Sequence, residues 1–141
     1  MTERRQRPRP QTVLVADDNP SVRQLWSVWL GLWNFLVLEA HDGAEAVQMA
    51  RQEHPALIVM DIAMPRLDGL SATRCLKSAS DTAEIPVVML TAHATGDHRQ
   101  RALDVGCEAF LTKPCDVDHL LSVIRVLLGR SSASPGHTDT H

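Results

Sequence analysis

The residues of this 141-residue chain that could do chemistry are acidic side chains and a lysine, each directly after an apolar run. They are Asp17, Asp18, Asp61 and Lys113. A carboxylate can act as a nucleophile, and cations can neutralise the charge of a phosphoryl group as it is transferred. These residue types therefore indicate phosphoryl transfer, and we expect Asp61, the most central carboxylate, to be the acceptor.

Three carboxylates brought together repel one another, and a divalent cation would relieve that repulsion. Mg²⁺ prefers oxygen ligands and keeps several waters beside one or two carboxylates. We expect Asp18 and Asp61 to bind Mg²⁺ directly, with the backbone carbonyl of Ala63 within reach. Asp17 would act through water, and Lys113 would supply further positive charge to the phosphoryl group.

Five short apolar runs alternate with five helical patterns, and this order predicts how the acidic residues are brought together. The predicted strands are 12–16, 35–38, 57–60, 85–90 and 109–112, and the predicted helices are 20–33, 44–52, 69–78, 95–105 and 116–128, with Gly106 and Gly129 as stops. Such alternation is typical of an α/β fold with a doubly wound parallel sheet. All strands of such a sheet end at the same edge, where the acidic residues and the lysine would meet.

The helix predicted at 20–33 is unusually rich in large apolar residues. Asn19 is expected to cap it, and its apolar stripe comprises Val22, Leu25, Trp26, Trp29 and Trp33, widened by Val28, Leu30 and Leu32. Two interpretations remain open. The helix is either packed deeply on all these residues, or it exposes an apolar flank to a partner.

Both ends of the chain are predicted to be disordered. Residues 1–10 hold four arginines and two prolines and are expected to form a basic, mainly solubilising arm; residues 130–141 form a polar tail. The domain itself would span 11–129. Three cysteines without CxxC spacing argue against a disulfide framework, and no signal peptide or membrane span is evident, so we expect a cytoplasmic protein.

Residues 12–128 resemble a response-regulator receiver domain of two-component signalling. The motifs that carry the resemblance are Asp17-Asp18-Asn19, Met60-Asp61-Ile62-Ala63-Met64-Pro65 with Asp68-Gly69, Leu90-Thr91-Ala92 and Phe110-Leu111-Thr112-Lys113-Pro114. The resemblance implies a flavodoxin-like (βα)5 fold with strand order 2-1-3-4-5. It also implies that Asp61 takes a phosphoryl group from the phosphohistidine of a histidine kinase, with Asp17 and Asp18 in the Mg²⁺ pocket.

The same resemblance implies roles for residues at the ends of the last two strands. Lys113 would contact the phosphoryl group, and its bond to Pro114 would be cis. Thr91 and Phe110 would form a switch pair, in which the hydroxyl moves toward the phosphoryl oxygens and the ring turns inward.

Three positions depart from the family pattern or leave a property open. Phe110 lacks the hydroxyl of a tyrosine at the aromatic switch position. Ala63 and His93 occupy positions that tune the lifetime of the phosphate. Ala63 cannot order a water, whereas His93 could donate a hydrogen bond or simply face solvent, so the lifetime stays open.

The expected function is that of a single-domain response regulator, because only 13 residues follow Leu128. Its partners would be a histidine kinase or histidine phosphotransfer protein and a downstream protein target. Direct nucleic-acid binding and membrane association are not expected, since the net charge is −3, and the protein would be a monomer or weak dimer. It would not be an enzyme beyond autocatalysed phosphotransfer and dephosphorylation.

Two alternatives remain. In the first, the chain is a receiver fragment of a hybrid kinase, a phosphorelay protein or a longer regulator. An aspartyl phosphatase of the haloacid-dehalogenase type is least favoured, because Ala63 stands where that family has a second acid.

Overall fold

The computed structural model describes residues 10–92 and 95–132, over which strands and helices alternate along the chain. The elements are β1 (Thr12–Ala16), α2 (Pro20–Leu32), β2 (Leu36–Ala40), α3 (Gly43–Glu53), β3 (Leu57–Met60), α4 (Gly69–Ser78), β4 (Val87–Thr91), α5 (Gly96–Asp104), β5 (Ala109–Thr112) and α6 (Val117–Ser132). Within the described residues, no helix has the length and hydropathy needed to cross a bilayer.

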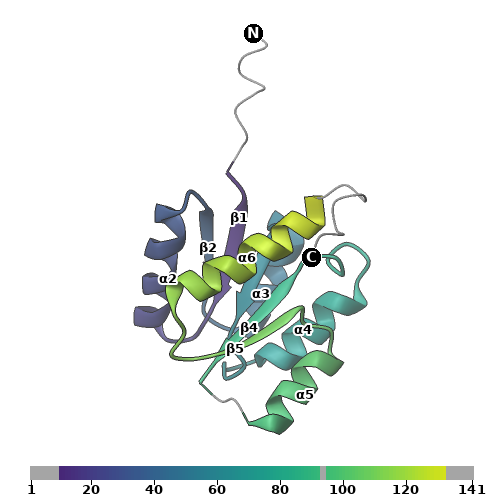
Figure 1. Ribbon diagram of the computed structural model, residues 1–141. Coiled ribbons are helices and arrows are strands. Elements are labelled where there is room, and N and C mark those ends of the chain that lie inside the picture. The colour runs from purple at the N-terminus through teal and green to yellow at the C-terminus, as the bar shows by residue number, and fades with distance from the viewer. Residues whose placement is uncertain (1–9, 93–94, 133–141) are drawn as a thin grey trace.

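The five strands form one parallel sheet in the order β2-β1-β3-β4-β5. Helices cover both of its faces (Figure 1), with α2 and α6 on one side and α3, α4 and α5 on the other. The predicted fold class and strand order are therefore confirmed.

The central strands β1, β3 and β4 are almost wholly apolar because both of their faces are covered. In β1, Leu14 packs into the layer of α3, α4 and α5, whereas Val13 and Val15 pack into the layer of α2 and α6. β3 is buried at every position. This two-sided burial explains why the sequence shows continuous apolar runs instead of alternation.

The two faces of α2 have different environments. Trp26 and Leu30 are buried against the sheet and α6, while Leu25, Val28, Trp29 and Leu32 are exposed to solvent. The predicted apolar stripe is thus divided, and of the two interpretations the structure supports the exposed flank. The predicted cap is confirmed: Oδ1 of Asn19 accepts hydrogen bonds from the first turn of the helix.

The prediction that Gly129 ends the last helix is wrong. α6 continues through Gly129 to Ser132. A glycine stops a helix by adopting a positive φ, as Gly106 does after α5 with a φ of 100°. Gly129 stays helical, at a cost of about 1 kcal/mol relative to alanine. The rest of the predicted arm and tail lies outside the described residues.

Candidate functional site

The carboxyl ends of the strands meet at one edge of the sheet and carry the predicted site residues. The backbone N–H of Asp61 donates to the carbonyl of Ala16 at 3.0 Å, and that of Lys113 donates to the carbonyl of Thr91 at 2.9 Å. These bonds continue the pairing of β3 with β1 and of β5 with β4 by one residue beyond the ends of β3 and β5. The backbone of the sheet therefore fixes where the first residue of each loop lies.

Three carboxylates come together at this edge. Asp17, Asp18 and Asp61 each offer an oxygen, and the three atoms lie within 4.8 Å of one another. Asp17 and Asp61 are buried, whereas Asp18 is exposed. An all-oxygen set with one side open to solvent suits a hard divalent cation that keeps several of its waters, which is the behaviour of Mg²⁺.

Lys113 is the cation of the site. Its Nζ donates to Oδ2 of Asp17 at 2.7 Å and to Oδ2 of Asp61 at 3.3 Å. Burial lowers the pKa of Lys113, but the hydrogen bonds and negative charges of the two aspartates outweigh burial, and the net pKa is raised. The lysine is therefore held fully charged between the two carboxylates.

The carboxyl of Asp61 has a pKa above its ordinary value. Burial is the largest cause, and the negative charge of Asp17 adds to it, while Lys113 and a hydrogen bond from the buried Thr91 oppose it. The negative charge of Asp61 is thus incompletely compensated by the protein. A divalent cation bound beside it would supply the missing compensation.

The loop after β3 is shaped by a close backbone approach. The N–H of Gly69 donates to the carbonyl of Ile62 at 2.9 Å, and a Cβ added to Gly69 would lie 2.1 Å from the carbonyl oxygen of Asp61. Only glycine fits there. The N–H of Ala63 donates to Oδ1 of Asp61 at 3.4 Å, a long bond that leaves this carboxylate oxygen weakly held.

An arginine that the sequence did not single out braces the acidic pocket. Arg23 of α2 donates from Nη1 to the backbone carbonyl of Asp17 at 2.7 Å and from Nε to Oε1 of Glu39 at 2.9 Å. It thereby ties the loop after β1 to β2. The available signal was a lone basic residue in a helix that is otherwise uncharged.

A second unpredicted pair fastens the loop after β3. Arg66 has a φ of 66°, and its Nε lies 3.1 Å from Oδ2 of the buried Asp42, which caps α3. A hydrogen bond from the N–H of Glu45 is the main cause that lowers the pKa of Asp42, and Arg66 adds to it against the effect of burial. Beside this pair, a Cβ on Gly43 would lie 1.9 Å from the carbonyl oxygen of Leu67.

The residues predicted as the switch pair are both buried. Thr91 is completely enclosed, and Phe110 lies in the core with the guanidinium of Arg99 4.8 Å from its ring centroid. The Lys113–Pro114 bond is cis, as the resemblance implies. His93 lies outside the described residues, so its effect on phosphate lifetime stays a prediction.

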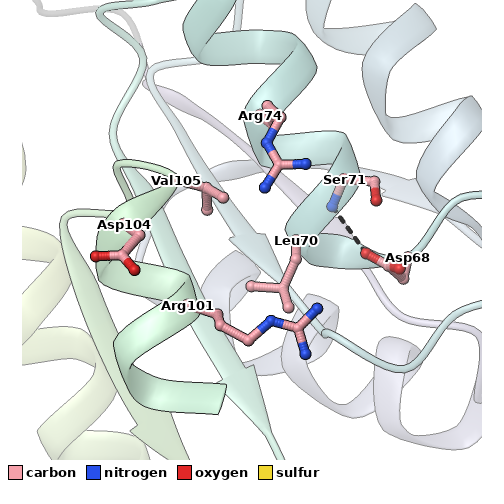
Figure 2. Close-up of a pocket in the computed structure, with 7 residues that line it drawn as sticks. All are labelled: Asp68, Leu70, Ser71, Arg74, Arg101, Asp104 and Val105. Atoms are coloured by element: carbon pink, nitrogen blue, oxygen red, sulfur yellow. Dashed lines mark hydrogen bonds between the residues drawn. The ribbon is translucent and has the colours of Figure 1, made fainter. Parts of the chain in front are cut away.

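A small pocket between α4 and α5 holds no part of the acidic set (Figure 2). Its volume is about 120 Å³, and its lining residues are Asp68, Leu70, Ser71, Arg74, Arg101, Asp104 and Val105. Two arginines and two aspartates balance in charge, and Asp68 is engaged as the cap of α4, accepting a hydrogen bond from the N–H of Ser71 at 2.7 Å. The chemistry therefore centres on the edge of the sheet.

Comparison with known proteins agrees with the geometry. A family model described as the response regulator receiver domain matches residues 13–125. The response regulator MprA of Mycobacterium ulcerans is 39% identical over 119 residues, which are 84% of this chain and 50% of that protein. The DNA-binding dual master transcriptional regulator RpaA of a Synechocystis species is 36% identical over 123 residues, 87% of this chain and 51% of that protein.

A solved structure adds a metal to the comparison. The receiver domain of the sensor histidine kinase PA1611 from Pseudomonas aeruginosa, with a magnesium ion coordinated in its active site cleft, superposes with a TM-score of 0.80. It is 30% identical and covers 85% of this chain and 98% of its own. The chain spans about half the length of the curated relatives it matches.

Proposed function

The chain belongs to the response-regulator receiver family of two-component signalling, and from this premise we propose that Asp61 accepts a phosphoryl group from a phosphohistidine. The observation that carries the proposal is the setting of Asp61 at the end of β3. Its carboxylate lies 3.3 Å from the ammonium of Lys113 and within 4.8 Å of oxygens of Asp17 and Asp18. A nucleophile, a cation and a set of metal ligands thus stand together.

In the proposed reaction a carboxylate oxygen of Asp61 forms a bond to phosphorus while the bond from phosphorus to the histidine nitrogen breaks. The reaction needs positive charge around the phosphoryl oxygens and an acceptor held in line. Lys113 is anchored by Asp17, which holds its ammonium toward Asp61. The weakly held Oδ1 of Asp61, with its 3.4 Å bond to Ala63, is the freer of the two oxygens to bond to phosphorus.

Mg²⁺ is the proposed cofactor, since the acidic oxygens fit a hard cation. Asp18 and Asp61 would bind it directly, with the carbonyl of Ala63, and Asp17 would act through water. When bound, the ion neutralises the charge that develops on the phosphoryl oxygens. The magnesium described in the cleft of the PA1611 receiver domain supports this assignment.

The proposed readout uses Thr91 and Phe110. The hydroxyl of Thr91 already hydrogen-bonds Asp61, so it is near enough to follow a phosphoryl group attached there. Its movement would change the packing between β4 and β5, where Phe110 lies under Arg99. A protein-binding surface over residues 91–113 and α6 would then switch with phosphorylation.

The proposed donor is a histidine kinase or a histidine phosphotransfer protein, and the proposed target is another protein. The expectation that nucleic acid is not bound draws no support from the relatives, since RpaA is described as a DNA-binding regulator. That description belongs to a protein about twice as long as the matched segment. The proposal here concerns the receiver part alone.

Phosphorylation by acetyl phosphate in the presence of Mg²⁺ tests the proposal. We expect the intact mass to rise by one phosphoryl group, the modification to be lost in hydroxylamine, and EDTA to prevent it. Asp61→Asn should abolish the modification, while the exposed Asp81→Asn, a matched control, should keep it. If Asp61→Asn were phosphorylated as fully as the protein without the substitution, the assignment of Asp61 would be refuted.

A further inference from the structure

The exposed side of α2 carries a stripe of four large apolar residues. The exposed fractions are 52% for Leu25, 61% for Val28, 38% for Trp29 and 70% for Leu32. Single apolar residues on a surface need no explanation, but a contiguous group on one helix face indicates an interaction site. We call these four residues the α2 stripe.

The fold itself does not use the α2 stripe. The opposite side of the helix supplies Trp26 and Leu30 to the core. Trp33, although 37% exposed, packs against α6, with the guanidinium of Arg125 5.1 Å from a ring centroid. Packing against the sheet and α6 is thus completed by other residues. Within the described parts of the chain, the stripe remains open to solvent.

The intervals between the residues of the α2 stripe are the same whether the helix is followed from its N-terminus or from its C-terminus. Positions 25, 28, 29 and 32 follow the i, i+3, i+4, i+7 pattern by which helices pack side by side, and the pattern is symmetric about its centre. Two copies of α2 related by a two-fold axis run antiparallel. Leu25 then lies opposite Leu32 of the second copy, and Val28 lies opposite Trp29 of the second copy.

The surface also provides a place for the side chains of a second copy. A shallow groove beside the N-terminal half of α2 is lined by Ser21, Gln24, Leu25, Ser27, Val28 and Glu39. In the antiparallel arrangement this half of the helix faces Trp29 and Leu32 of the second copy. The same patch therefore offers both bulky side chains and a hollow, which an isologous contact requires.

Charge distinguishes a second copy from a different partner. Residues 24–38 contain no Asp, Glu, Lys, Arg or His. The charge of Glu39, which lines the groove, is neutralised by an ion pair with Arg23 at 2.9 Å. A two-fold contact places a surface against itself, so charges near the axis would meet like charges, and an uncharged apolar surface avoids this cost. Partners of different sequence commonly use complementary charges for specificity, and this stretch has none to offer.

We propose that the α2 stripe is the interface of a two-fold homodimer in which two α2 helices pack antiparallel. The contact lies on α2, apart from the proposed switch surface over residues 91–113 and α6. It forms without a phosphodonor. Its test is consequently separate from the test of phosphorylation, and either can fail without the other.

Sedimentation equilibrium of the full chain, without Mg²⁺ or a phosphodonor, tests the interface. We expect a monomer–dimer equilibrium that Leu32→Glu weakens by at least about 30-fold, because it places a charge in an apolar contact opposite Leu25 of the second copy. Leu103→Glu is the matched control, because Leu103 is 49% exposed but lies on α5. Thermal unfolding should show that both variants remain folded, since both residues are exposed.

A charge exchange tests the antiparallel register. Leu25→Lys alone and Leu32→Glu alone should each dissociate the dimer, whereas the double variant should restore it by pairing each lysine with the glutamate of the second copy. Restoration should weaken with salt. A protein that is monomeric at every concentration overturns the proposal and leaves the stripe to another protein; equal weakening by Leu103→Glu, or no restoration in the double variant, also overturns it.

Discussion

The ammonium of Lys113 lies 2.7 Å from Oδ2 of Asp17, although 96 positions separate the two residues in the sequence. Their strands are not neighbours, since β3 and β4 lie between β1 and β5. Asp61, at the end of β3, shares the same ammonium at 3.3 Å. The cation of the site thus already occupies two of the carboxylates that a metal ion would use.

Replacing Lys113 should therefore tighten Mg²⁺ binding while it impairs phosphorylation. Removing one positive charge about 5 Å from a dication gains about 1–2 kcal/mol even at the dielectric constant of water, or about tenfold in affinity. Calorimetric titration of Lys113→Ala with MgCl₂ measures this. Arg74→Ala, which also removes one positive charge, is the control and should change the affinity little. If Lys113→Ala bound Mg²⁺ more weakly, Lys113 and Mg²⁺ would not compete for the carboxylates of Asp17 and Asp61.

Asp61→Asn should stabilise the protein at neutral pH when no divalent ion is present. Because the pKa of Asp61 is raised in the folded state, its ionisation favours unfolding. The protonated carboxyl of Asp61 favours the folded state. This contribution to stability is fully present below the ordinary carboxyl pKa of 3.8 and is lost as pH rises through the folded pKa. Thermal melts at pH 7 should give a higher Tm for the variant, and saturating Mg²⁺ should reduce or reverse the difference. A lower Tm of the variant without Mg²⁺ would contradict the inference that the charge of Asp61 destabilises the folded protein.

Cys107 should make stability fall at alkaline pH. Burial, with the negative charge of Glu108, raises its pKa from 9.0 to about 11. The unfolded thiol loses its proton near pH 9 and the folded one near pH 11, so stability declines between these values, by at most about 3 kcal/mol. Urea unfolding from pH 8 to 11 measures how steeply the unfolding free energy falls with pH, and this slope should be smaller in Cys107→Ala.

Native protein should also react with a thiol reagent at the exposed Cys75 long before it reacts at the buried Cys107.

Two glycines should respond to alanine in opposite directions. Nothing lies within 4 Å of a Cβ added to Gly129 in α6, so Gly129→Ala should stabilise by about 0.5–1 kcal/mol. A Cβ on Gly69 would meet the carbonyl of Asp61, so Gly69→Ala should destabilise by about 2 kcal/mol or more and impair phosphorylation. Urea denaturation of both variants measures the difference. If Gly69→Ala left the unfolding free energy unchanged, the close approach of position 69 to the carbonyl of Asp61 would be disproved.

Arg23→Met should loosen the acidic pocket. The carbonyl of Asp17 and the carboxylate of Glu39 would each lose a hydrogen bond, for a loss of about 1–3 kcal/mol in unfolding free energy. Mg²⁺ affinity should fall as well, because Asp17 is less firmly placed. Glu39→Gln is the informative comparison: it should destabilise less and leave Mg²⁺ binding nearly unchanged. If the two variants had equal effects, Arg23 would act only through its contact with Glu39 of β2, and its bond to the carbonyl of Asp17 would not position the pocket.

Much of the site could be predicted from sequence because a parallel sheet determines it. Continuous apolar runs mark strands buried on both faces, and the residue after each run must lie at the shared edge. Asp17, Asp61 and Lys113 follow from this rule, and the structure places the ammonium of Lys113 within hydrogen-bonding distance of both aspartates. The fold class followed from the same runs.

The braces around the site could not be predicted in this way. The contact of Arg23 with the loop after β1 depends on how α2 is rotated about its axis, and an apolar stripe as wide as this one does not determine that rotation. Arg66, which pairs with Asp42, adopts a positive φ that its residue type does not suggest. Gly129 was misjudged for a related reason, since a glycine near a helix end is equally compatible with a stop or with continuation.

The strand order has a consequence for how the protein emerges during synthesis. Translation delivers all three carboxylates of the pocket before the strand that bears Lys113, which is the last of the sheet and lies at its edge. Until β5 is added, a partly folded chain would hold Asp17, Asp18 and Asp61 without their lysine. The core itself is completed later still, because α6 follows Lys113 in the chain and supplies Leu120 and Ile124 to the layer that it shares with α2.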